Sequence, residues 1–261
     1  MDGNCGCSSG STASIGVTPE VTPKATSQKG LPLPPNEPAR RDRDAEHNRV
    51  LFRHLLALNV LSSPGAGKTT LVQRLLQDRD LISGADPLKS HYVPVKAGVI
   101  VGDLAPDRDA KRLRKTGVPV VQINTGDRCY LEADRITQAA QQLDLAALNL
   151  LIIENVGNLI CPAPYDLGED LRLVLMSVTE GEDTALKYPT PFKSAHAIII
   201  NKIDIAEAIG FKRDEALRHL RLVAPQALIF ELSATTGQGL ASFYAYLGQA
   251  IFQCQAKMDP N

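Results

Sequence analysis

Short, almost wholly apolar segments alternate along the chain with longer segments in which polar and apolar residues mix at helical spacing. The apolar segments are residues 57–61, 95–101, 118–123, 150–153, 173–178, 197–200 and 227–230. Strands buried on both faces of a parallel sheet have this near-continuous apolar character, and helical crossovers connect one such strand to the next. The pattern predicts a three-layer α/β domain with a mostly parallel sheet.

The N-terminal region has a different composition. Ser, Thr, Gly, Pro and Lys dominate residues 8–38, which contain few apolar residues, so no core can form there. Apolar residues then recur at mostly helical spacing over residues 40–56, which predicts a helix leading into the first strand. We therefore expect a flexible tail at residues 1–37 and one large domain at residues 38–261.

Composition and charge narrow the classes of function. The 261 residues are 44% apolar, enough for one sizeable core, and the formal net charge of −1 argues against nucleic acid as a main partner. No apolar stretch approaches the ~20 residues that span a bilayer, and the N-terminus has no signal-peptide pattern. The five cysteines are scattered and do not form a secreted disulfide framework. We expect a cytoplasmic protein with reduced thiols and no membrane partner.

The segment from Ser62 to Thr69 (SSPGAGKT) resembles a phosphate-binding P-loop, with an apolar strand before it and an amphipathic helix at residues 70–76 after it. Backbone N–H groups in such a loop surround phosphate oxygens. Lys68 is expected to reach the β- and γ-phosphates and the Thr69 hydroxyl to bind Mg²⁺. The strict pattern has Gly at the position of Ser62. The nucleotide-binding residues expected here are Gly65, Ala66, Gly67, Lys68, Thr69 and Thr70.

Two later segments resemble the guanine-reading motifs of GTPases. They are Asn201-Lys202-Ile203-Asp204 and Ser233-Ala234-Thr235. The Asp204 carboxylate would accept hydrogen bonds from N1–H and the 2-amino group of guanine, a donor pair that adenine lacks. We therefore expect GTP rather than ATP as the ligand, with Asn201, Lys202, Asp204, Ser233 and Ala234 in the base site.

Acidic residues follow two of the predicted strands, where ligands of parallel sheets bind. Glu154 is expected to act on Mg²⁺ through a water, and the Gly157 N–H to point at the γ-phosphate. Asp103 is expected to hold Mg²⁺ or to orient the attacking water. Asp107 and Asp109 either join it or form an exposed first helical turn. The expected catalytic residues are thus Lys68, Asp103 and Glu154. Hydrolysis should be slow, because Lys68 is the P-loop's one cation and no arginine finger is evident.

Four segments carry a resemblance to a known family: residues 124–129 (NTGDRC), 154–162 (ENVGNLICP), 166–169 (DLGE) and 177–183 (SVTEGED). In this order they resemble the hydrogenase nickel-incorporation GTPases of HypB type. The resemblance implies a SIMIBI-class fold, GTP hydrolysis with Mg²⁺, nickel and zinc binding, and a homodimer linked by nucleotide and metal. It also implies nickel delivery to the large subunit of [NiFe] hydrogenase with a companion nickel-maturation protein.

The resemblance assigns a metal site to Cys129 and Cys161, whose thiolates are soft ligands suited to Zn²⁺ and Ni²⁺. Two copies of the chain across a two-fold axis would supply four thiolates. From composition alone, both cysteines read as small core residues. The family usually has His directly after the first Cys, where this chain has Tyr130. Cys5 and Cys7 resemble an N-terminal nickel motif of some members, although its further Cys is replaced by Asp2.

Two alternatives stay open. A urease-accessory GTPase would share the fold and metal use, but usually has Cys-Pro-His where this chain has Cys161-Pro162-Ala163. A GTP-dependent regulatory switch without metal would leave Cys129 and Cys161 inert. If the metal is bound, the four-residue spacing between Gly157 and Cys161 suggests that γ-phosphate loss moves a metal ligand.

Overall fold

The computed structural model describes residues 37–82, 94–103, 108–126 and 128–256. Residues 1–36 of the predicted tail, which include Cys5 and Cys7, lie outside the described residues, as does Asp107, so the tail and the N-terminal metal motif stay predictions. The described helices and strands all fall in one compact unit that begins at Asn36.

The centre of the domain is a sheet of seven strands in the order β3-β2-β4-β1-β5-β6-β7, and every neighbouring pair is parallel. The strands are β1 (Leu56–Ser62), β2 (Ala97–Asp103), β3 (Val120–Asn124), β4 (Leu150–Glu154), β5 (Leu171–Ser177), β6 (Ala197–Asn201) and β7 (Leu228–Glu231). All seven predicted strands are therefore present, within a few residues of their expected bounds.

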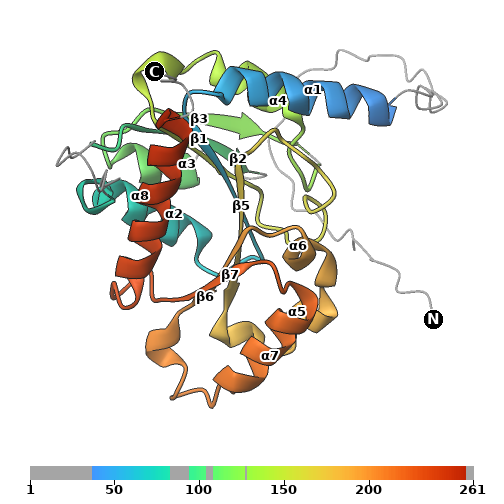
Figure 1. Ribbon diagram of the computed structural model, residues 1–261, viewed down its shortest axis with the longest axis vertical. Coiled ribbons are helices and arrows are strands. Elements are labelled where there is room, and N and C mark those ends of the chain that lie inside the picture. Colours follow the sequence, from blue (N-terminus) through green and yellow to red (C-terminus); the bar gives the residue numbers. More distant parts are fainter. Residues whose placement is uncertain (1–36, 83–93, 104–107, 127, 257–261) are drawn as a thin grey trace, which may run out of the picture. The chain divides into compact units, whose positions relative to one another are not determined.

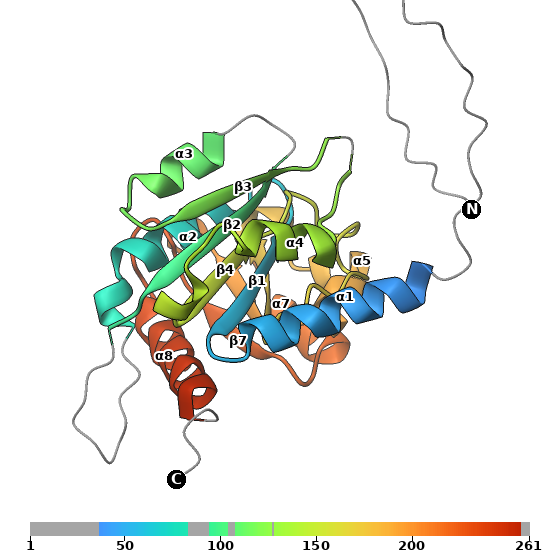
Figure 2. The same cartoon turned by 90° about the horizontal axis from the view of Figure 1, so that it is seen from above.

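One face of the sheet is covered by α2 (Lys68–Gln77), α3 (Arg108–Arg114) and α8 (Leu240–Ala256), as Figure 2 shows. Alternate strand residues such as Leu58 and Val60 pack there against Leu71 of α2 and Phe243 of α8. Because every second residue of a strand points to the same face, the intervening residues point to the other face and pack against the helices there.

The other face carries two groups of helices (Figure 1). Helices α1 (Glu37–Phe52) and α4 (Ala133–Ala140) share a core with β1, β2 and β4, while α5 (Thr184–Lys187), α6 (Pro189–Lys193) and α7 (Arg213–Val223) pack against β5 and β6. The sequence placed the end of the first helix at residue 56, which is wrong, because the chain turns after Phe52 and Leu56 already pairs in β1. The three-layer α/β prediction is confirmed.

Parallel pairing brings the carboxyl ends of the strands to one edge. Val60 of β1 and Val101 of β2 both pair with Glu154, and Ser177 of β5 pairs with Asn201. The predicted nucleotide residues therefore converge from several strands. No helix among the described residues is long and apolar enough to cross a membrane.

Candidate functional site

The loop between β1 and α2 has the backbone that a P-loop requires. Gly65 and Gly67 have positive φ angles of 77° and 103°, which disfavour any residue with a side chain. A Cβ on Gly67 would also lie 2.4 Å from Nδ2 of Asn201. Ser62 instead is the last residue of β1, in extended conformation. Its departure from the strict pattern therefore causes no strain, because that position needs no glycine.

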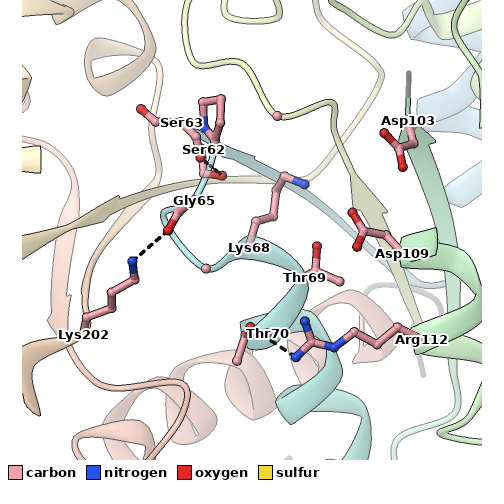
Figure 3. A pocket seen from close by; sticks show the side chains of 14 residues that line it. Ser62, Ser63, Gly65, Lys68, Thr69, Thr70, Asp103, Asp109, Arg112 and Lys202 are labelled. Carbon is pink, nitrogen blue, oxygen red and sulfur yellow. Dashed lines mark hydrogen bonds between the residues drawn. The ribbon is translucent and has the colours of Figure 1, made fainter. Parts of the chain in front are cut away.

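A cavity of about 420 Å³ opens beside this loop (Figure 3). Its lining comes from the P-loop, the start of α2, the end of β2, α3 and the segments after β4 and β6. The lining residues are Ser62, Ser63, Pro64, Gly65, Gly67, Lys68, Thr69, Thr70, Gly102, Asp103, Asp109, Arg112, Gly157 and Lys202. Most of the predicted phosphate and Mg²⁺ residues thus meet at one cavity.

Behind the cavity lies the carboxylate of Glu154, which is completely buried. Its Oε1 accepts hydrogen bonds from Lys68 Nζ at 2.8 Å and from Thr69 Oγ1 at 2.5 Å. Its Oε2 is also buried but has no hydrogen-bond partner among the described residues. An unpaired carboxylate oxygen is costly in a protein interior, so this oxygen of Glu154 has the capacity to accept a further hydrogen bond or a cation.

The guanine motifs contact the P-loop directly. Asn201 donates from Nδ2 to the carbonyl of Ala66 at 2.8 Å and accepts at Oδ1 from the N–H of Ala234 at 3.0 Å. Lys202 donates to the carbonyl of Gly65 at 2.8 Å, and among the described residues it is the one non-glycine with positive φ. These bonds fix the three nucleotide segments relative to one another.

The remaining base-site residues lie outside the cavity lining. Asp204 is exposed on the short 3₁₀ helix η4 (Ile203–Ile205). The Ser233 hydroxyl accepts from the N–H of Thr236 at 3.1 Å, which closes the second guanine loop. The cavity thus gathers most of the predicted phosphate-binding residues, and the other predicted base residues lie beyond its lining.

Helix α3 adds two charged side chains to the cavity. Asp109, for which the sequence left two readings open, lines it together with Asp103, and Figure 3 shows both carboxylates directed toward the Thr69 region. Arg112 also lines the cavity and was missed from the sequence. The signal lay in the spacing of Asp109 and Arg112, since residues three apart share one face of a helix.

The structure brings Cys129 and Cys161 together, although they are far apart in the chain. Both are partly exposed free thiols, and hydrogen bonding to Cys129 is the largest cause that raises the pKa of Cys161 above its usual value. Nδ2 of Asn158 also lies 3.3 Å from the Cys161 sulfur. In the described part of the chain no three His, Cys, Asp or Glu residues are grouped to hold a metal. Within the described residues, Cys129 and Cys161 are therefore a pair of thiols with no third such group beside them.

Comparison with known proteins gives the family. Residues 56–231 match the family described as "CobW/HypB/UreG, nucleotide-binding domain". The hydrogenase maturation factor HypB of Escherichia coli K12 is 41% identical over 211 residues, 80% of this chain and 68% of that protein. The chain belongs to the HypB family. The resemblance noted from the four sequence segments is confirmed.

Other HypB proteins extend the comparison. The hydrogenase/urease maturation factor HypB of Helicobacter pylori is 42% identical over 203 residues, 76% of this chain and 78% of that protein. HypB of Azotobacter chroococcum is 41% identical over 210 residues, and the chain spans only 65% of its length. The crystal structure of H. pylori HypB in complex with nickel superimposes with a TM-score of 0.73 at 39% identity, covering 82% of this chain and 96% of that one. This match confirms the α/β fold with its mostly parallel sheet, which the chain shares with HypB.

Tyr130 takes part in an aromatic stack. Its ring lies parallel to that of Tyr165, with centroids 4.0 Å apart and planes at 7°. The guanidinium carbon of Arg41, from α1, lies 4.9 Å from the Tyr165 centroid. Burial is the largest cause that raises the pKa of Tyr165 to about 12, and hydrogen bonding to Tyr130 adds to it. The stack therefore joins the segments that carry Cys129 and Cys161.

A buried polar network holds the segment after Cys161. Oε1 of Glu169 accepts from Nδ2 of Asn59 at 3.0 Å and from Nε of Arg172 at 2.7 Å, and Oε2 accepts from the N–H of Leu167 at 2.8 Å. The other Arg172 nitrogens donate to the carbonyls of Ala163 and Tyr165 and to the Ser194 hydroxyl. Glu169 lies in the family segment at residues 166–169, but the sequence indicates no role for it.

Proposed function

We propose that this chain is a GTPase that binds nickel or zinc and assists nickel insertion into [NiFe] hydrogenase. The observation that carries the nucleotide part is the buried Glu154 carboxylate, half satisfied by Lys68 and Thr69 and half without a partner, at the back of a P-loop cavity. The metal part is supported by the paired thiols of Cys129 and Cys161 and by the names of the relatives.

Mg²⁺ fits the donor set at this cavity. The ion prefers oxygen ligands, and the hydroxyl of Thr69, the free oxygen of Glu154 and the carboxylate of Asp103 are all oxygens. These three residues would hold it, with Glu154 acting through water. A bound Mg²⁺ would supply positive charge that stabilises the negative charge on the phosphate oxygens of the nucleotide. A water bound to Mg²⁺ would also donate to the Glu154 oxygen that has no partner among the described residues.

The protein's own residues divide the work on GTP. P-loop N–H groups from Gly65 to Thr70 surround the phosphates, and Lys68 contacts the β- and γ-phosphates. The Gly157 N–H donates to the γ-phosphate, and Asp103 orients the water that attacks it. The products are GDP and inorganic phosphate. Beyond the phosphates, Asp204 reads the guanine edge, while Asn201, Lys202, Ser233 and Ala234 hold the base site.

The metal cargo is held by thiolates. Cys129 and Cys161 of two copies would form a four-thiolate site on a two-fold axis, tetrahedral for Zn²⁺ or square-planar for Ni²⁺. GTP and metal would then each favour the homodimer. The delivery partners are the hydrogenase large subunit and a companion nickel-maturation protein, in the cytoplasm. Cys5 and Cys7 are proposed as a further nickel site.

Turnover of GTP against ATP tests the nucleotide part. Purified protein should hydrolyse GTP slowly and ATP hardly at all, and Lys68→Ala should abolish turnover. Asp204→Asn should shift preference toward xanthine nucleotides, whose C2 carbonyl accepts where guanine donates. The unaltered protein is the matched control throughout. Equal turnover of ATP and GTP by that control contradicts the guanine assignment.

Equilibrium dialysis and sedimentation test the metal part. The protein should bind Ni²⁺ or Zn²⁺, and a non-hydrolysable GTP analogue plus metal should give more dimer than GDP alone. If neither the nucleotide nor the metal changes the oligomeric state, the proposed metal site shared between two copies is contradicted. GTP turnover with no metal binding at all would favour the regulatory switch instead.

A further inference from the structure

A third cationic side chain reaches the phosphate cavity from a helix that no P-loop motif includes. Ala110 and Leu113 of α3 are completely buried, in the core cluster that α3 shares with the sheet, α2 and α8. Their burial fixes the rotation of α3 and leaves Asp109 and Arg112 on the side that lines the cavity. Figure 3 shows Arg112 extending from α3 toward Thr70 at the start of α2.

The three cavity cations have different partners. Lys68 is paired with the buried carboxylate of Glu154, and Lys202 is bonded to the carbonyl of Gly65. Arg112 donates from Nε to Oε1 of Gln73 at 2.5 Å and from Nη2 to the Thr70 hydroxyl at 3.2 Å. Both of these acceptors, the ones found among the described residues, are uncharged.

A phosphate oxygen is a stronger acceptor for Arg112 than an amide or a hydroxyl. Charge-assisted hydrogen bonds are roughly twice as strong as neutral ones, and the guanidinium fork matches two phosphate oxygens at once. Thr70, which now accepts from Arg112, stands beside Thr69 at the phosphate end of α2. A guanidinium placed there needs only a local side-chain rearrangement to exchange Gln73 for a phosphate.

We propose that Arg112 binds a phosphate group of the guanine nucleotide from the α3 side of the cavity, leaving Gln73 when it does so. Lys68 approaches the same phosphate chain from the P-loop, so the nucleotide is held between two cations from different elements. This inference rests on the proposed nucleotide site and adds a binding residue to it. The contact belongs to the bound nucleotide in general, so GDP and GTP should both depend on it.

Calorimetric titration of GDP and of a non-hydrolysable GTP analogue tests the inference on the full chain. Arg112→Gln should weaken both ligands by about 10- to 100-fold, the range expected for one hydrogen-bonded charge. Arg108→Gln, an exposed arginine on the same helix that does not line the cavity, is the charge-matched control and should bind as the unaltered protein does.

Gln73→Ala separates phosphate binding from a purely structural link between α2 and α3. If Arg112 binds phosphate, removing its neutral acceptor leaves GDP affinity unchanged or raises it. The inference is overturned if Arg112→Gln binds GDP within twofold of the unaltered protein, or if Gln73→Ala weakens GDP as much as Arg112→Gln does. Failure of the unaltered protein to bind GDP would overturn the proposed nucleotide site itself, and with it this residue's role.

Discussion

Two buried glutamates stand at the two ends of the segment between β4 and β5. Glu154 begins it and Glu169 lies near its end, and their side chains are 0% and 3% exposed. Each pairs with a cation that is itself nearly buried, Lys68 in one case and Arg172 in the other. They differ in the hydrogen bonding of the second carboxylate oxygen. Oε2 of Glu169 accepts a hydrogen bond, whereas Oε2 of Glu154 has no hydrogen-bond partner among the described residues.

This difference separates a pair whose hydrogen bonds are completed within the fold from one whose hydrogen bonds are incomplete. A fully satisfied buried network stabilises a unique arrangement, whereas a half-satisfied one is unfavourable until another group completes it. The Glu169–Arg172 pair is completed by Asn59, Leu167 and backbone carbonyls, so it needs nothing from outside. The Glu154–Lys68 pair stands against an open cavity, where a ligand can complete it.

The same substitution at both sites tests this comparison most strongly. Glu169→Gln leaves Arg172 buried without its counter-charge, and breaking such a pair costs about 3–5 kcal/mol. Glu154→Gln should cost less, about 1–2 kcal/mol, because Lys68 lines the cavity, where its ammonium group can turn toward water. Urea unfolding of the two variants measures the difference. Equal losses of unfolding free energy would show that both pairs serve the fold alone.

The next largest effect is expected on metal binding by Cys129 and Cys161. These two thiols lack further metal ligands among the described residues, whereas the nearby Glu169–Arg172 network is fully hydrogen-bonded. Cys129→Ala and Cys161→Ala should each remove most metal binding, since either change leaves one thiolate per chain. Their unfolding free energy should change little, because both thiols are partly exposed. Metal stoichiometry on a chain lacking residues 1–37 measures this without interference from Cys5 and Cys7. Buried Cys254→Ala is the control, and metal loss in that variant would contradict the assignment.

A smaller effect is expected on the contribution of Mg²⁺, the proposed partner of Glu154, to nucleotide affinity. Glu154→Gln should reduce the gain in GDP affinity that Mg²⁺ provides by about tenfold, because an amide replaces a charged oxygen donor. Glu169→Gln should leave that gain unchanged in the folded protein. Titrations with and without Mg²⁺ give the ratio for each variant. If Mg²⁺ raises the GDP affinity of Glu154→Gln as much as that of the unaltered protein, Glu154 is not part of the Mg²⁺ site.

The fold was predictable because its determinants are local. Each buried parallel strand is an apolar run, and the P-loop and guanine motifs have fixed spacings that sequence alone displays. The Glu169 network was not predictable, because Asn59 lies 110 positions away and pairs with Glu169 only through the register of the sheet. Arg112 was missed for a similar reason, since its direction depends on which residues of α3 are buried.

The smallest effect concerns Tyr130, which stands where the family usually has a histidine ligand. Its ring is stacked on Tyr165, and a phenol must lose its proton before its oxygen can bind a metal as a phenolate. Tyr130→Phe keeps the stack and should change metal affinity by less than about threefold, well under the tenfold that 1.4 kcal/mol represents. Tyr130→His should raise the affinity or widen the range of metals, because a neutral imidazole binds both Zn²⁺ and Ni²⁺. If Tyr130→Phe loses metal as severely as Cys129→Ala, the phenol is a ligand and the thiolate-only site is wrong.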